Sequence, residues 1–113
     1  MNKIGGNIDC LLKYQSVERS AIGEDVSAWV ELQTIRGFLD LMTNGKTYDA
    51  YNKAVVDSTH VFICDYVSIE TTDENGNERQ LQAVINGKTY DVEYIDNPQE
   101  LNYHLEIFLK KVG

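Results

Sequence analysis

Three carboxylates near the C-terminal end of this sequence have the types and spacing that could support hydrolytic chemistry. Asp91, Glu93 and Glu106 fall in two alternating segments that could lie side by side as strands. Glycoside hydrolysis uses such a carboxylate pair, one as the acid and one as the nucleophile or base. The whole chain is acidic, however, with 18 Asp and Glu residues against 10 Lys and Arg residues. Alternating acids on the outer face of a hairpin are common in such a chain, so the pattern does not single out a catalytic pair.

Histidine and cysteine, which bind metals or act as bases and nucleophiles, are scarce. His60 and His104 fall in strand-like segments, and Cys10 and Cys64 fall in apolar or alternating segments. A zinc site needs about four such ligands at closer spacing. No Ser or Cys lies in a recognisable nucleophile turn. We therefore expect half-buried histidines, two small buried cysteines, no bound metal, no cofactor and no enzymatic activity. A disulfide stays open, because it depends on a separation that sequence does not give.

Two short motifs partly match ion-binding loops. The tripeptide Gly-Lys-Thr occurs at 45–47 and at 87–89. A phosphate-binding loop also needs Gly five positions before its second Gly, where this chain has Asp40 and Gln82. The acidic stretch 73–78 begins like a calcium loop but lacks the Gly and Glu that the loop requires later. Neither motif predicts a ligand, and the acidic stretch is typical of a solvated turn.

The length and the net charge of the chain limit the number of domains and the classes of function that remain. The 113 residues correspond to one domain, so we expect residues 1–113 to form a single unit. The formal charge of −8 argues against a surface that grips nucleic acid, because phosphate binding needs clustered cations. No apolar run is long enough to span a bilayer, and the N-terminus has no apolar signal core. We therefore expect neither a membrane segment nor a secretion signal.

Alternation of apolar and polar residues predicts strands rather than helices. Asn86-Gly87, between two apolar runs, predicts a tight hairpin, because both turn positions need positive φ. Residues 18–25 and 72–78 are polar and are expected as turns. The expected fold is all-β, a small six-stranded antiparallel barrel or sandwich. The segments expected as strands are 9–17, 26–35, 59–69, 80–85, 89–95 and 103–112.

The core positions follow from alternation within each strand. For 26–35 the sequence leaves open whether Trp29 or its neighbours Val30 and Leu32 face inward. The other residues expected in the core are Leu12, Val61, Ile63, Val84, Val92, Leu105 and Ile107.

Residues 37–57 stand apart as a long irregular loop. A connection longer than ~12–15 residues without clear structure is often functional. Asn44-Gly45 allows the chain to reverse direction within it, and its hexapeptide recurs at 86–91 as an independent turn. Apolar residues around that tip are typical of a contact with another chain. The residues expected to make this contact are Phe38, Leu41, Met42, Thr43, Asn44, Gly45, Lys46, Tyr48 and Tyr51.

The order of four motifs resembles the head–tail connector proteins of tailed bacteriophages, the head-closure or stopper component. The motifs are a Trp-containing strand at 28–32, a Thr-His strand at 58–66, a Gly-x-x-Tyr hairpin at 84–92 and a closing strand at 101–107. The resemblance covers nearly the whole chain. One departure is Asp65, which stands near a position where the family often has Arg.

The resemblance implies a structural virion protein in the neck of the phage particle, assembled in the cytoplasm of the host bacterium. It implies a barrel subunit of which about six to twelve copies form a ring around the channel for the genome. The ring would lie between a portal-side adaptor protein and a tail protein. Residues 37–57 would project toward the channel, with Thr43 to Lys46 nearest the axis. DNA would pass without sequence-specific binding, since an acidic lumen does not retain it.

Two alternatives remain open at this point. One is a tail-completion or other neck ring subunit, which would share the barrel and the symmetry but dock elsewhere. The other is a small ligand-binding or enzymatic barrel. Ring formation would separate the first two classes from the third.

Overall fold

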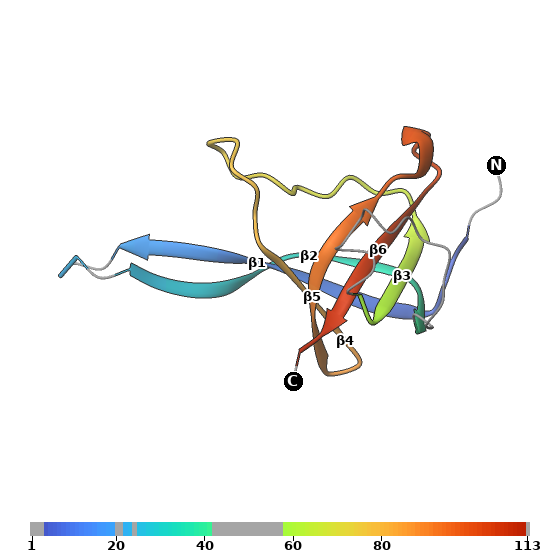
Figure 1. Ribbon diagram of the computed structural model, residues 1–113, viewed down its shortest axis with the longest axis horizontal. Helices are drawn as coiled ribbons and strands as arrows, with labels where there is room; N and C mark the ends of the chain where they lie inside the picture. Colours follow the sequence, from blue (N-terminus) through green and yellow to red (C-terminus); the bar gives the residue numbers. More distant parts are fainter. Residues whose placement is uncertain (1–3, 20–21, 24, 42–57, 113) are drawn as a thin grey trace.

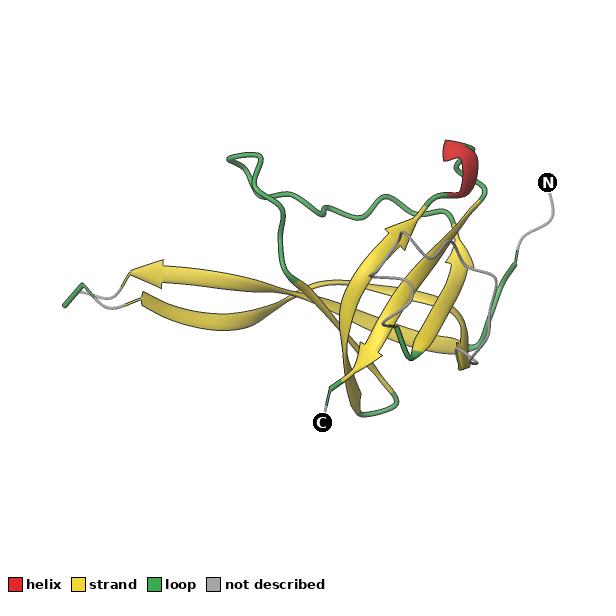
Figure 2. Cartoon of the chain, in the orientation of Figure 1, coloured by secondary structure: helices red, strands yellow, loops and turns green. Residues whose placement is uncertain are grey.

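Among the residues that the structure describes, six antiparallel strands make up the sheet, as the all-β prediction requires (Figures 1 and 2). The computed structural model describes residues 4–19, 22–23, 25–41 and 58–112. A short 3-10 turn, η1 (Pro98–Glu100), precedes the last strand. The strands are β1 (Ile8–Arg19), β2 (Asp25–Leu41), β3 (His60–Asp65), β4 (Leu81–Ile85), β5 (Lys88–Asp96) and β6 (His104–Lys111).

The strands close into a barrel in the order β1-β2-β3-β6-β5-β4. Residues Leu11 to Tyr14 of β1 pair with Val84 to Leu81 of β4 and complete the ring. Closure removes the unpaired strand edges that an open sheet would expose. Of the two architectures left open by the sequence, the barrel is therefore the one observed.

The hairpin expected at Asn86-Gly87 is confirmed. These two residues join β4 to β5, and their φ angles of 51° and 77° are both positive, as a type I′ turn requires. The strand expected over 59–69 is shorter than predicted, because β3 ends at Asp65. Val67 and Ile69 instead pack against the core from an irregular segment that leads to β4.

The barrel interior holds three of the predicted core residues, Leu12, Leu105 and Ile107. The predicted Val92 is partly buried and packs against the same cluster. The buried cluster is Cys10, Leu12, Ile35, Phe62, Cys64, Ala83, Ile85, Tyr90, Leu105, Ile107 and Leu109.

The predicted inward faces of β3 and β4 are wrong. In β3, Phe62 and Cys64 join the barrel core, whereas Val61 is buried in a separate cluster with Phe108. Ile63 is only partly buried and packs against that second cluster. Both faces of β3 are apolar, so period-two alternation carries no signal there. In β4 burial does alternate, but Ala83 and Ile85 belong to the core, and Val84 shares the outer face with the polar Gln82.

Strand β2 is longer than predicted, and residues 37–41 belong to it rather than to a loop. Gly37 is buried, and a Cβ atom there would clash with the Ile63 carbonyl oxygen and lie 2.9 Å from the Cβ of Cys64. Only glycine therefore permits this close approach of β2 to β3. Pairing with β3 across Gly37–Leu41 supplies backbone hydrogen bonds that the sequence pattern does not reveal. The rest of the predicted loop, 42–57, lies outside the described residues.

Candidate functional site

The β1–β2 hairpin extends well beyond the barrel as a two-stranded projection (Figure 1). We call the described residues 15–19, 22–23 and 25–30 of this hairpin the arm. Pairing of β1 with β4 ends at Tyr14, so the arm leaves the barrel there. Neither candidate core face of this part of β2 is buried, because Trp29 and Val30 are each 38% exposed. A register shift leaves Leu32 as an extra residue in β2, and Leu32 packs against the core at the base of the arm.

The barrel end that carries the β4–β5 turn is basic, although the chain as a whole is acidic. Lys88, Lys110 and Lys111 are all exposed there. The pKa of His60 is lowered below its usual value, first by desolvation on burial and then by Lys111 and Lys88. Lysine side chains from β5 and β6 therefore lie around the start of β3.

Two residues predicted to contact a neighbouring chain are described by the structure. Leu41 is 67% exposed and pairs in register with His60, at the basic end. Phe38 is 45% exposed on the barrel wall, in register with Ile63. The remaining predicted contact residues lie outside the described part of the chain, namely Met42, Thr43, Asn44, Gly45, Lys46, Tyr48 and Tyr51.

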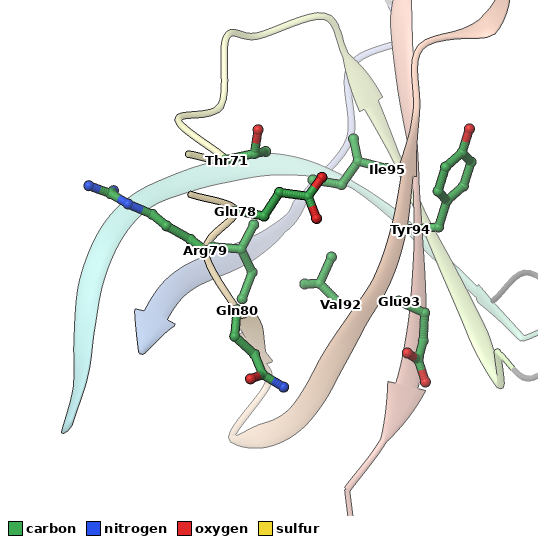
Figure 3. A pocket seen from close by; sticks show the side chains of 9 residues that line it. Thr71, Glu78, Arg79, Gln80, Val92, Glu93, Tyr94 and Ile95 are labelled. Carbon is green, nitrogen blue, oxygen red and sulfur yellow. The ribbon is translucent and has the colours of Figure 1, made fainter. Parts of the chain in front are cut away.

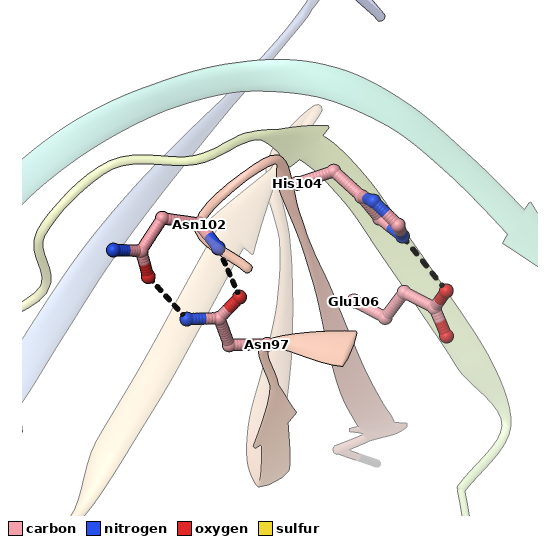
Figure 4. Close-up of polar contacts among 4 residues, drawn as sticks. All are labelled: Asn97, Asn102, His104 and Glu106. Atoms are coloured by element: carbon pink, nitrogen blue, oxygen red, sulfur yellow. Dashed lines mark hydrogen bonds and ion pairs between the residues drawn. The ribbon is translucent and has the colours of Figure 1, made fainter. Parts of the chain in front are cut away.

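At the opposite end of the barrel, a turn between β5 and β6 is fixed by two asparagines (Figure 4). The side-chain nitrogen of Asn97 donates to Oδ1 of Asn102 at 2.7 Å, and the backbone N–H of Asn102 donates to Oδ1 of Asn97 at 3.1 Å. Nearby, His104 and Glu106 form a pair with an Nε2 to Oε2 distance of 3.1 Å. These bonds give the turn a defined shape at the protein surface.

The three carboxylates considered for catalysis do not form a pair. Asp91 lies opposite Lys110 and accepts a hydrogen bond from Gln82, while Glu106 lies opposite Asp96, further along the same two strands. Glu93 occupies the register shift between them. The structure therefore does not bring Asp91, Glu93 and Glu106 together as the carboxylate pair that glycoside hydrolysis uses, and the acid that faces Glu106 is Asp96.

A groove of about 520 Å³ runs between β5 and the segment that leads into β4 (Figure 3). Its walls mix apolar residues with Glu78 and Glu93, and the two side chains point in different directions in Figure 3. Arg79 stacks on the Tyr14 ring, with its guanidinium carbon 4.2 Å from the ring centroid. The groove offers no nucleophile with an adjacent base, so its arrangement does not match a catalytic site.

The two cysteines are free thiols inside the barrel. Burial, with a smaller contribution from Cys64, raises the pKa of Cys10 to about 12. Burial, followed by the charge of Asp65, raises the pKa of Cys64 to about 11. Because the thiolate is the reactive form, these groups are poor nucleophiles and poor metal ligands.

We expect both thiols to resist maleimide labelling in the folded protein at pH 8 and to react fully in urea. The reason is their burial together with the raised pKa of each thiol. Mass spectrometry of the labelled chain counts the adducts. Labelling of the folded protein at the rate seen in urea would contradict this assignment.

Within the described residues, no cluster of three or more His, Cys, Asp and Glu side chains is arranged to hold a metal ion. The same part of the chain has no helix with the length and hydropathy needed to cross a membrane. The surfaces that stand out are instead the arm, the basic end and the asparagine-fixed turn, and each is suited to contact with other macromolecules.

Comparison with known families agrees with the resemblance seen in the sequence motifs. Residues 10–112 match the family described as phage head completion protein, a span that includes all six strands except the first two residues of β1. No curated protein matches the sequence closely enough to count as a relative. The chain therefore belongs to the phage head completion protein family and is a structural component of the phage particle at the head–tail connection.

Proposed function

We propose that this protein is the subunit of a ring in the phage neck that closes the exit channel of the capsid and provides the docking surface for the tail. The observation that carries the proposal is the family match over residues 10–112, which spans almost the whole barrel. A closed barrel with no catalytic arrangement among its described residues suits a structural subunit. The expected partners are other copies of the chain, a portal-side adaptor protein and a tail protein.

The distribution of charge supports two different docking faces. Lys88, Lys110 and Lys111 lie at one end of the barrel, whereas Asp96, Glu100 and Glu106 lie at the other. A subunit between two unlike partners needs two unlike surfaces, and opposite charge at the two ends gives each end its own preference. DNA would pass through the ring without sequence-specific contacts, since the net charge of −8 repels phosphate.

We further propose that the segment between Leu41 and Ser58 contacts the channel or a neighbouring subunit. Leu41 pairs with His60, so the segment starts and ends close to the basic end of the barrel. Its residues Thr43 to Lys46 are proposed to lie nearest the channel axis. Phe38 and Leu41, both exposed in the single chain, are proposed to contact the neighbouring subunit.

The test compares particles produced without this protein and with it, and measures their DNA content, their tails and the copy number of the protein. Particles without it should package DNA but lose it before tails join. Particles with it should contain a fixed copy number, measured by native mass spectrometry of isolated neck complexes. One or two copies in each particle, or normal tails in its absence, would overturn the proposal. Co-purification with the portal rather than the tail tube would distinguish head closure from tail completion, the alternative role.

We expect the isolated protein to associate only weakly at low salt. Each copy carries a charge of −8, so copies repel one another when counterions are few. Added salt should strengthen association, and an adaptor ring should act as a template for it. Sedimentation velocity at low and high salt measures the change. A tight oligomer that salt does not affect would exclude charge as the controlling factor.

A further inference from the structure

Strand β5 continues beyond the point where its pairing with β4 stops. The two strands pair only as far as Gln82 and Asp91, so within the described residues the stretch 92–96 of β5 has no strand partner on that edge. The chain before β4 follows β1 instead, because the Gln80 carbonyl accepts a hydrogen bond of 3.0 Å from the backbone N–H of Gln15. A strand edge of this kind presents backbone groups to which a further strand can pair.

The space beside this edge is the groove of about 520 Å³ between β5 and the segment that leads into β4, which we call the β5 groove (Figure 3). Val92 and Ile95 pack against the barrel core, and Figure 3 shows their side chains on the side of β5 that faces Glu78. At about 3.3 Å per residue, the stretch 92–96 has the length to pair with an extended segment of about five residues. The β5 groove therefore offers a strand an apolar floor and a free edge.

The walls around the β5 groove are acidic. A second groove, of about 540 Å³, shares part of its wall and reaches the arm. The one cation that lines the two grooves is Arg79, and its guanidinium already stacks on the Tyr14 ring. The carboxylates that line them are Asp73, Glu74, Glu78 and Glu93. A partner that covers these walls is favoured by positive charge, because like charges brought together across a contact are costly.

We propose that the β5 groove binds an extended segment of another protein of the phage neck, which adds to β5 as a strand and carries lysine or arginine beside apolar residues. Its apolar side chains pack against Leu81, Val92 and Ile95, and its cations face Glu78. The occupant is a different protein, because an acidic groove repels a second copy of a chain with a charge of −8. This inference rests on the proposed place of the protein in the neck and specifies the chemistry of one partner.

Two short peptides test the chemistry of the β5 groove. The probes are capped pentapeptides of sequence Lys-Val-Lys-Val-Lys and Glu-Val-Glu-Val-Glu, titrated into the ¹⁵N-labelled protein and followed by NMR. We expect the cationic peptide to shift the amide signals of 78–81 and 92–95, with an affinity about tenfold or more above that of the acidic peptide. Shifts confined to other residues, or no shifts at millimolar peptide, would contradict the assignment of the groove.

A pair of charge reversals tests the role of the acidic wall. Glu78→Lys changes the wall of the β5 groove, and Glu31→Lys makes the same change at an exposed residue that lines neither groove. We expect Glu78→Lys to weaken binding of the cationic peptide about tenfold and Glu31→Lys to leave it unchanged. Equal binding by the two variants, both with the parental melting temperature, would overturn the inference.

Photo-cross-linking in assembled particles identifies the occupant. The photoreactive residue p-benzoylphenylalanine replaces Gln80, which is exposed and lines both grooves. Mass spectrometry should find it joined to a segment of a different neck protein that contains lysine or arginine. A cross-link to a second copy or to residues 42–57 of the same chain, or no cross-link in particles that contain the protein, would overturn the docking and leave the proposed ring intact. Native mass spectrometry of the same necks tests the ring separately, through its copy number.

Discussion

Replacing Ile107 with alanine should lower the free energy of unfolding by about 2–5 kcal/mol. The side chain is fully buried, and Ile107 lies between Phe62 of β3 and Ile95 of β5 in the sheet. Truncation removes its transfer free energy and leaves a cavity that a closed barrel cannot easily fill. Urea denaturation monitored by the fluorescence of Trp29, the single tryptophan, measures the change.

Leu101→Ala is the matched control, because Leu101 is 48% exposed and loses a similar volume. It should change the free energy of unfolding by no more than about 0.5 kcal/mol. Leu105→Ala, at a buried neighbour in β6, should resemble Ile107→Ala. If the Ile107 and Leu105 variants unfold at the same urea concentration as the parent, the inward face assigned to β6 is wrong.

Strand β6 shows where sequence reasoning succeeds. Along its first half, Leu105 and Ile107 alternate with His104 and Glu106, and the structure buries only the apolar set. Because one face meets solvent, alternation specifies the orientation. In β3 both faces are covered, one by the barrel core and one by the cluster of Val61 and Phe108, so the same rule gave the wrong inward face.

The arm was missed for a different reason. Alternation in residues 26–35 indicates a half-buried strand. It does not reveal that this strand extends beyond the other strands of the barrel. The position along β2 at which pairing with β3 begins depends on the close approach of the two strands at Gly37. This contact joins segments that are far apart in the sequence. A signal was nevertheless present, because two uncharged stretches, 14–17 and 27–30, flank a polar turn in a chain that is 25% charged.

The second prediction with a large expected effect concerns the long connection between β2 and β3. Deleting residues 43–47 should leave the barrel folded, because the deletion lies between Leu41 and Ser58 and outside every described strand. We expect variant particles to incorporate the protein but to leak DNA or fail to join tails. The physical reason is that the proposed channel contact involves Thr43 to Lys46, whereas every described strand is unchanged.

A replacement of residues 43–47 by Gly and Ser at constant length separates the chemistry of this segment from its reach. If its side chains hold the DNA, the replacement should leak as the deletion does, whereas if reach alone matters, it should retain DNA because a flexible linker spans the same distance. Density-gradient separation of full and empty particles, together with plaque titre, measures both outcomes. Wild-type DNA retention and infectivity in the deletion variant would exclude the channel role. The segment would then be a surface excursion, and closure of the channel would have to come from the walls of the ring itself.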